Sequence, residues 1–498
     1  MRSSLQWTWR GPIRRKPGRR FRRIAGMTEP TSTEIDDVLE LVHREGLRYL
    51  ASIDDDLVRR PGAEDTALGF DGNLPEVGAG AVKALTEILD HGMDAAVRSS
   101  GPRMFHFVTG GVTPAALAGD WLASLLDQNS FSWVGSPLGS RLEAISLSWL
   151  KELFGLPSDW GGVLTSGATM ANFSALAAAR HWWGEQHGVD VEDHGLAGLL
   201  PMPVLSSGYI HPSAVKALAM LGVGRTNVQR FAKDDVGRLN LAGLKAGLEG
   251  HQGAALLIVA NAGEVNAGDF DPISDMIELA RSHNAWVHVD GAFGLFARVA
   301  PRAAAQAAGV EEADSVIADG HKWLNVPYDC GFAFVRDPLL LAKSFTAGAA
   351  YLPSSDEPHP NFGYLGPDMS RRARSFATWA TLRAYGRAGY RAMVERHLEL
   401  ATHLGERVQE SNELELLAPV QLNIVCFRYR PEGLTEEELN DLNNRIGEAI
   451  IEDGRIYVGS TRYAGKVALR PAIVNWRTTT ADVDLVADVV LELGKRLR

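Results

Sequence analysis

The chain has 498 residues, of which 45% are hydrophobic, and a formal net charge of -11 at pH 7. A chain of this length can bury a large core and should divide into one large domain and one or two smaller ones. Its negative charge gives no overall electrostatic reason to bind nucleic acid or an anionic membrane. No apolar stretch approaches the roughly 20 residues that span a bilayer. We therefore expect a soluble protein that acts on a small molecule.

Two cysteines, Cys330 and Cys426, are present in the sequence. Two thiols exclude a disulfide framework, and they are too few for a thiolate cluster that binds zinc or iron–sulfur. A reducing, cytoplasmic environment is the expected compartment.

Residues 1–26 are crowded with arginine and contain no acidic residue. No apolar region follows the arginine pairs, so this segment lacks the physical signature of an export signal. We expect residues 1–30 to be a disordered basic tail, unless the true start is Met27.

Helical spacing dominates the first third of the chain. Apolar residues recur every three or four positions in four stretches, over residues 34–53, 81–93, 115–128 and 140–155. Between about residues 161 and 335, seven short β-rich runs alternate with helical stretches; the runs are 162–166, 203–207, 227–232, 255–260, 285–289, 314–318 and 331–335. This alternation predicts an α/β fold, with a mainly parallel sheet and helices on both faces.

The last third of the chain changes pattern again. A long helix is expected over 371–386 and another over 393–410, and β-rich runs at 422–429 and 466–476 then alternate with helices at 436–454 and 480–497. These elements predict a small α+β C-terminal domain. We therefore divide the chain into the tail 1–30, a helical N-terminal segment 31–110, a large domain 111–390 and the C-terminal domain 391–498.

Chemically useful residues follow several of the predicted strands. In an open parallel sheet, ligands bind beyond the carboxyl ends of the strands. Asp290 ends one β-run and Lys322 closely follows the next, so a carboxylate and an amine should face one pocket. Ala168 and Thr169 open an alanine-rich helix after another strand, and free N–H groups there can hold a phosphate. His211 precedes a proline at a predicted helix start, beside the same edge.

Each of these signals has an ordinary explanation when taken alone. Small residues before a helix are most often a simple N-cap, and a lone histidine is more often a structural cap than a catalyst. Together, however, they supply an amine for an aldehyde, a carboxylate for a ring nitrogen, a ring to stack and a phosphate cradle. Pyridoxal 5′-phosphate (PLP) satisfies all four, with Lys322 as its Schiff-base lysine, Asp290 as the partner of the pyridinium nitrogen and His211 stacked on the ring.

Five motifs in this order, TSGATMAN, HPSAVKA, GEVNAGDFDP, HVDGAFG and ADGHKWLNVP, resemble those of the group II PLP-dependent amino acid decarboxylases. The similarity runs from about Phe105 to Arg387. The resemblance implies the PLP-dependent transferase fold of the aspartate-aminotransferase type (fold type I). It also implies a homodimer whose active sites lie at the subunit interface.

The resemblance also assigns roles to residues. It implies that Ala168 and Thr169 bind the cofactor phosphate and that His321 contacts the cofactor. It places Thr109 and Phe131 near the bound amino acid, and it matches Arg371 and Arg372 to a basic turn of the family.

Tyr351 falls where the family has its mobile-loop tyrosine. In the family, this phenol helps to protonate the intermediate after carbon dioxide leaves, and phenylalanine there accompanies aldehyde-forming relatives. A tyrosine at this position favours simple decarboxylation, although a tyrosine that merely packs in the loop is the competing interpretation.

Two features bear on the substrate. Glu264 and Val265 replace two threonines of the family pattern, so Glu264 either alters substrate choice or points into solvent. Phe105, Phe131 and Trp133 favour an aromatic or aliphatic substrate if they line the pocket, and have no such meaning if they belong to the core.

The sequence thus predicts PLP-dependent decarboxylation of an L-amino acid to its amine and carbon dioxide, with an aromatic or other apolar substrate favoured. The alternatives are an aminotransferase or carbon–carbon lyase on the same fold, a decarboxylating aldehyde synthase, or a non-catalytic scaffold. Intact Lys322, Asp290 and His211 argue against the scaffold. No metal is required.

Overall fold

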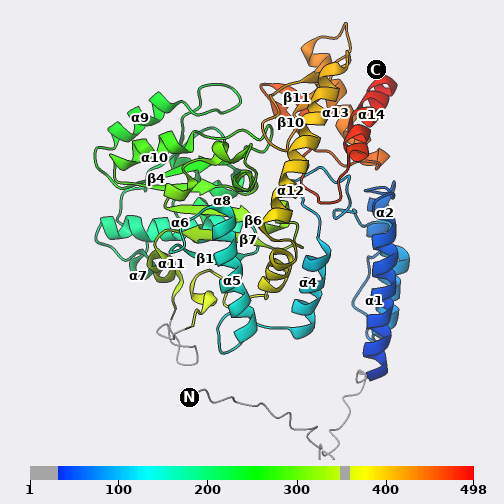
Figure 1. The fold of residues 1–498 in the computed structure, drawn as a ribbon, viewed down its shortest axis with the longest axis horizontal. Helices are drawn as coiled ribbons and strands as arrows, with labels where there is room; N and C mark the ends of the chain where they lie inside the picture. The colour runs from blue at the N-terminus through cyan, green and yellow to red at the C-terminus, as the bar shows by residue number, and fades with distance from the viewer. Residues whose placement is uncertain (1–31, 348–358) are drawn as a thin grey trace, which may run out of the picture.

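The computed structural model describes residues 32–347 and 359–498 (Figure 1). In this part of the chain, seven strands form one sheet in the order β1-β7-β6-β5-β4-β2-β3. The strands are β1 (Gly161–Thr165), β2 (Val204–Ser206), β3 (Val228–Arg230), β4 (Leu256–Asn261), β5 (Ala285–Asp290), β6 (Ser315–Asp319) and β7 (Gly331–Val335). Neighbours from β3 to β6 pair in parallel, whereas β7 runs antiparallel to β6 and to β1. The predicted mainly parallel sheet is confirmed, and each of the seven predicted runs overlaps a strand.

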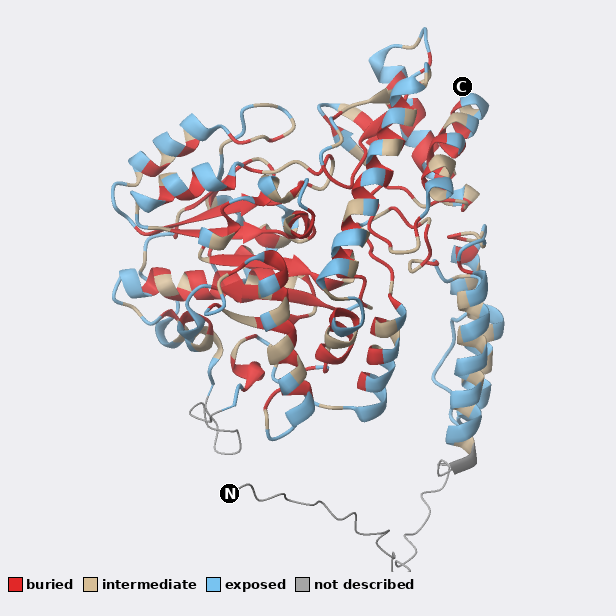
Figure 2. Cartoon of the chain, in the orientation of Figure 1, coloured by how far each residue is buried: buried red, intermediate tan, exposed pale blue. Residues whose placement is uncertain are grey.

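Helices cover both faces of this sheet. α6 (Ala168–Gln186) packs on β1, β5, β6 and β7 and against α8 (Pro212–Met220) and α11 (Pro338–Phe345). α10 (Ile273–Arg281) packs on β4 and β5 and against α9 (Leu241–Gly250), and α5 (Pro137–Phe154) packs on β1; α7 (Val191–His194) follows α6. Every residue of β4, β6 and β7 is buried, as expected for strands that are covered on both faces (Figure 2).

One long helix joins the large sheet to the C-terminal region. α12 (Ser375–Glu410) packs on α4 (Pro114–Leu126) and α5, and its later turns contact α14 (Thr480–Leu497). The sequence predicted two helices here. The structure agrees in its main feature, because the helical geometry of α12 breaks at Gly386, where φ is 60°, a conformation that glycine adopts without steric cost, and two helical segments meet there.

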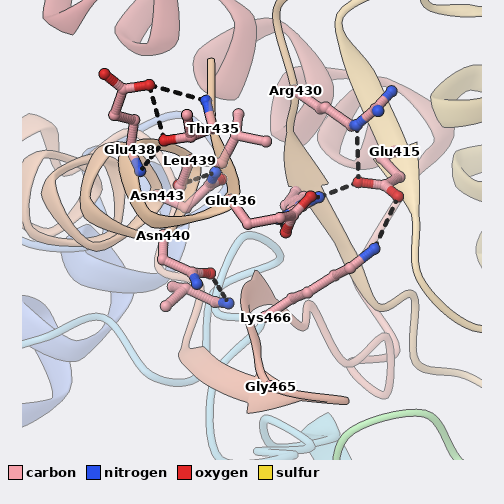
Figure 3. Close-up of polar contacts among 12 residues, drawn as sticks. Glu415, Arg430, Thr435, Glu436, Glu438, Leu439, Asn440, Asn443, Gly465 and Lys466 are labelled. Atoms are coloured by element: carbon pink, nitrogen blue, oxygen red, sulfur yellow. Dashed lines mark hydrogen bonds and ion pairs between the residues drawn. The ribbon is translucent and has the colours of Figure 1, made fainter.

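The C-terminal region has its own antiparallel sheet, in the order β10-β11-β9-β8, and its own apolar core. The strands are β8 (Leu414–Leu416), β9 (Phe427–Tyr429), β10 (Ser460–Tyr463) and β11 (Lys466–Leu469), packed with α13 (Glu436–Asp453) and α14. Figure 3 shows how α13 begins: Thr435 and Glu438 exchange hydrogen bonds in a capping box. The same view shows Lys466 on β11 paired with Glu415 on β8 across the sheet.

The N-terminal helices form an arm at the side of the molecule (Figure 1). α1 (Ser32–Ser52) packs on α3 (Ala81–Glu87), and the short α2 (Ala63–Leu68) lies between them in the chain. The arm is mostly exposed (Figure 2), and its apolar side chains Ile35, Leu39 and Leu47 are more than half exposed.

Within the described residues, no helix combines the length and the apolarity that crossing a membrane requires.

A buried ion pair joins the start of α12 to α5 and β1. Arg371 contacts both oxygens of Glu143 at 2.7 and 3.2 Å, and both side chains are about 2% exposed. Arg371 also donates to the carbonyl oxygens of Ser130 and Leu164, while Glu143 accepts the N–H of Leu164. The neighbouring Arg372 instead forms a partly exposed pair with Asp120.

Replacing Glu143 with alanine should lower the free energy of unfolding by about 3–5 kcal/mol, because the guanidinium of Arg371 would stay buried without its partner. Arg372→Ala is the matched control, since an exposed pair contributes about 0–1 kcal/mol. Chemical denaturation of both variants measures the difference, and equal losses would contradict it.

Candidate active site

A cavity of about 410 Å³ opens at the carboxyl ends of β1, β5 and β6. Its lining includes six of the residues that the sequence singled out: Ala168, Thr169, His211, Asp290, His321 and Lys322. They come from four separate parts of the chain, so their convergence is a property of the sheet topology.

Lys322 lies in a short turn of π-helix, Gly320–Leu324, directly after β6. Its backbone departs from helical geometry (φ -94°, ψ -107°), which marks a break in that turn. The Lys322 ammonium lies 3.2 Å from an oxygen of Asp319 and 5.8 Å from the centre of the Phe293 ring. The amine is therefore held inside the cavity wall.

Asp319 is a site residue that the sequence reasoning missed. It is the last residue of β6 and is almost fully buried. One of its oxygens accepts the backbone N–H of Ala168, the other contacts Lys322, and His321 lies 3.6 Å from the first. The rule that ligands bind beyond strand ends could have found it, because it occupies the same strand-end position as Asp290.

Asp290 ends β5, and both of its carboxylate oxygens accept hydrogen bonds. The side chain of Asn172 donates to one oxygen at 2.9 Å, and the backbone N–H of Ala292 donates to the other at 3.2 Å. An ionised carboxylate offers acceptors only. The group therefore suits a protonated ring nitrogen presented from the cavity.

The first turn of α6 faces the same cavity. Gly167 is its N-cap and supplies no side-chain cap. The Ala168 N–H is taken by Asp319, whereas the N–H groups of Thr169 and Met170 have no acceptor within the described part of the chain. These free donors at the positive end of a helix dipole fit a phosphate group. With Lys322 and Asp290 they match the chemical demands of PLP.

His211 caps α8 and also faces the cavity. Its Nδ1 accepts the backbone N–H of Ser213 at 3.2 Å and lies 2.7 Å from the Ser213 hydroxyl. Burial lowers the pKa of His211 below its ordinary value, with the charge of Asp290 opposing this shift. The sequence offered a structural cap and a ring in the cavity as alternatives for His211. The structure shows that His211 caps α8 and also lines the cavity.

The ring of His321 stacks on Tyr328, with ring centres 4.2 Å apart. The hydroxyl of Tyr328 lies 3.4 Å from that of Thr109. Thr109 therefore touches a lining residue of the cavity without being among the described residues that line it. Tyr328 was not singled out from the sequence.

Phe131 lies outside the cavity lining in the single chain, and its place near a bound amino acid, which the resemblance implies, stays a prediction. Its ring packs edge-on against Tyr364. Phe105 belongs to the apolar core of the C-terminal region, and Trp133 stacks on His359. Phe105 and Phe131 are buried, so the core interpretation describes these two rings, whereas Trp133 is only half-buried.

Tyr351 and the loop that follows it lie outside the described residues, as does the basic tail.

Glu264 and Val265 both line the cavity. The Glu264 side chain is buried and accepts hydrogen bonds from the backbone N–H groups of Asn266 and Ala267, both at 2.9 Å. Burial raises the pKa of its carboxyl group. Glu264 therefore does not point into solvent, which was one of the two possibilities left open by the sequence.

Comparison with known proteins agrees with this geometry. Residues 78–430 match the model of the pyridoxal-dependent decarboxylase conserved domain. The chain is 28% identical over 439 residues to the aromatic-L-amino-acid decarboxylase of Bacillus atrophaeus, covering 87% of this chain and 88% of that protein. It is 31% identical over 434 residues to the L-2,4-diaminobutyrate decarboxylase of Rhizobium meliloti, covering 85% and 84%.

Solved structures show the same fold. The crystal structure of Oryza sativa TDC with PLP and tryptamine superposes with a TM-score of 0.86 at 24% identity, covering 95% of this chain and all of that one. Mouse CSAD gives a TM-score of 0.85 at 23% identity. The fold type I architecture expected from the sequence is confirmed. Because the family model matches well over half of the sequence, the chain belongs to the pyridoxal-dependent decarboxylase family and is a PLP-dependent amino acid decarboxylase.

Proposed function

We propose that this chain converts an aromatic or other apolar L-amino acid to its amine and carbon dioxide, with Lys322 as the residue that binds PLP covalently. The observation that supports this most is the convergence of Lys322, Asp290, His211 and the first turn of α6 around one cavity.

Each residue has a role that its geometry suits. PLP, when bound, supplies an electron-withdrawing ring that accepts the electrons of the breaking bond between Cα and the carboxylate. The N–H groups of Thr169 and Met170 bind its phosphate, Asp290 holds the ring nitrogen, and His211 covers a face of the ring. The Lys322 amine would hold the cofactor covalently through its aldehyde group until a substrate amine binds. Tyr351 remains our proposal for the group that returns a proton to Cα.

The preference for an apolar side chain now rests on different rings from those that the sequence suggested. Tyr209, Phe293 and Tyr328 line the cavity and provide aromatic surface there. Such a surface stabilises an apolar or aromatic substrate by excluding water. The aromatic-L-amino-acid decarboxylase among the relatives supports the same preference.

Glu264 supports a second candidate, an amino acid with a cationic side chain. No ion pair within 4 Å involves this buried carboxylate among the described residues, and it faces the cavity. An ammonium group on the substrate would neutralise it. The diaminobutyrate decarboxylase among the relatives supports this alternative.

We also propose that the active unit is a homodimer with its active sites at the subunit interface. Apolar side chains of the α1 arm are exposed in the single chain, as are Leu125 on α4, Phe107, and Tyr328 in the cavity lining. Exposed apolar surface on this scale is typical of an interface.

Replacing Lys322 with alanine should abolish release of carbon dioxide and amine, because the described residues that line the cavity include no second lysine to hold the cofactor aldehyde covalently. Borohydride reduction followed by peptide mass analysis should find PLP on Lys322 in the unmodified enzyme. Lys343→Ala, an exposed lysine paired with Glu185, is the control and should keep full activity. Label on another lysine, or turnover by the alanine variant, would refute the assignment. Release of a keto acid or an aldehyde in place of the amine would indicate one of the alternative reactions.

His211→Asn should separate the two roles of this residue. Asparagine is a good N-cap, so the unfolding free energy should stay within about 0.5 kcal/mol of the original, whereas His211→Ala should lose about 1 kcal/mol. Loss of the stacked ring should weaken PLP binding by about tenfold in both variants. Fluorescence titration with PLP measures this, and unchanged PLP affinity in His211→Asn would leave the residue a structural cap only.

Glu264→Gln tests the choice of substrate. If the substrate is aromatic, kcat/KM for it should change by less than about threefold, because the Glu264 oxygens are already engaged by the turn that follows. If the substrate is a diamino acid, kcat/KM should fall by about tenfold or more for that substrate alone. Rates with L-tryptophan, L-tyrosine and L-2,4-diaminobutyrate decide the question, and a diamino acid preference lost in Glu264→Gln would overturn the aromatic proposal.

A further inference from the structure

A buried chain of hydrogen bonds runs beneath the active-site carboxylate. Trp286, His288 and Asp290 alternate along β5 and so point to the same face, toward α6. The Trp286 indole donates to the Ser315 hydroxyl at 2.9 Å, and that hydroxyl lies 2.8 Å from His288 Nδ1. His288 Nε2 lies 2.7 Å from the side-chain oxygen of Asn172 on α6. The amide nitrogen of Asn172 donates to Asp290 at 2.9 Å, which completes the chain.

The two ends of this chain fix the proton positions between them. The indole at one end can only donate, and the Asp290 carboxylate at the other accepts a hydrogen bond at each of its oxygens. Asn172 must therefore turn its amide nitrogen toward Asp290 and its oxygen toward His288. His288 must then carry its proton on Nε2 and accept at Nδ1 from the Ser315 hydroxyl. Full burial lowers the pKa of His288 to about 4, which agrees with the neutral ring that this order requires.

Asn172 also connects to the second residue that faces the cofactor. Its amide nitrogen lies 3.4 Å from the Ser213 hydroxyl, which in turn lies 2.7 Å from His211 Nδ1. One amide group therefore contacts Asp290 directly and His211 through a single hydroxyl.

The inner members of the network are fully buried, and each has its hydrogen-bond partners. Asn172, His288 and Ser315 have no solvent exposure, and none of their side-chain polar atoms lacks a partner. Buried polar groups that are all satisfied favour one arrangement strongly, because any rearrangement leaves a donor or acceptor unpaired in a medium of low dielectric constant. Such a network is therefore suited to hold the side chains at its end, here Asp290, in one fixed position.

We propose that Asn172 is the positioning residue that fixes Asp290 and His211 together for the cofactor ring, and that His288 and Ser315 set the orientation of its amide. The inference rests on the roles proposed above for Asp290 and His211. It explains why three polar residues lie fully buried behind the cavity without reaching the cofactor space themselves. Asn172 acts through Asp290 and His211 and is not a catalytic residue.

Asn172→Asp tests this with almost no change in side-chain volume. The new carboxylate cannot donate to Asp290 and places a like charge beside it. PLP should dissociate at least about tenfold more readily, because a hydrogen bond to a charged group is lost. The visible circular dichroism of bound PLP should change with the orientation of its ring. At saturating PLP, kcat should fall by more than about tenfold while the substrate KM changes by less than about threefold.

Asn443→Asp is the matched control. Asn443 is also fully buried, with hydrogen bonds to Tyr429 and Leu439, but it lies in the C-terminal region away from the cavity. The same substitution there should lower stability and leave PLP affinity and the circular dichroism of bound PLP unchanged.

Ser315→Ala covers the case in which Asn172→Asp does not fold. It removes the hydroxyl that links Trp286 to His288 in the hydrogen-bond network and should shift PLP affinity in the same direction by a smaller factor, of about threefold. In the double variant the two effects should be less than additive, because both act through one amide. Unchanged PLP affinity and circular dichroism in the folded variants would overturn the positioning role. The proposed function fails separately, if the unmodified enzyme releases carbon dioxide from no L-amino acid.

Discussion

The register of the large sheet is the constraint on which the site depends. β5 and β6 pair in parallel with Asp290 opposite Ile317, so Asp319 and Lys322 follow at the same edge as Asp290. β7 is antiparallel to both β6 and β1, and it places Asp319 and Thr165 opposite the same residue, Gly331. Two antiparallel pairings in succession leave β1 pointing the same way as β6. The start of α6 therefore reaches the same edge.

The close approach of these segments requires glycine at the crossing. A Cβ atom at Gly331 would lie 2.6 Å from the Cα of Gly167 and 2.9 Å from the Thr165 hydroxyl. No side chain fits there without moving the turn that opens α6. The packing of the sheet and the placement of the N–H groups at the start of α6, which we propose bind the phosphate, therefore both require glycine at this crossing.

Much of this arrangement could be predicted from the sequence, because it depends on local periodicity and on strand ends. The seven β-rich runs and the positions of Lys322, Asp290 and His211 follow from that reasoning. What could not be predicted depends on contacts between distant segments. Asn172 looks like an ordinary helix residue in the sequence, and its proposed role depends on its contacts with Asp290 and His288 on β5.

The aromatic residues show that residue type alone does not predict which side chains line the cavity. Phe105 and Phe131 are of a residue type that often lines apolar pockets. In the single chain, however, both rings are buried and neither lines the cavity. Hydrophobicity alone does not distinguish a pocket ring from a core ring. Likewise, the sequence suggested that Glu264 is unusual, but only the structure shows that it faces the cavity.

The most direct test of the account is a crystal structure of the protein with PLP. It should show a covalent bond from Lys322 to the cofactor and the ring nitrogen within about 3 Å of Asp290. A cofactor bound elsewhere, or a ring nitrogen turned away from Asp290, would contradict it.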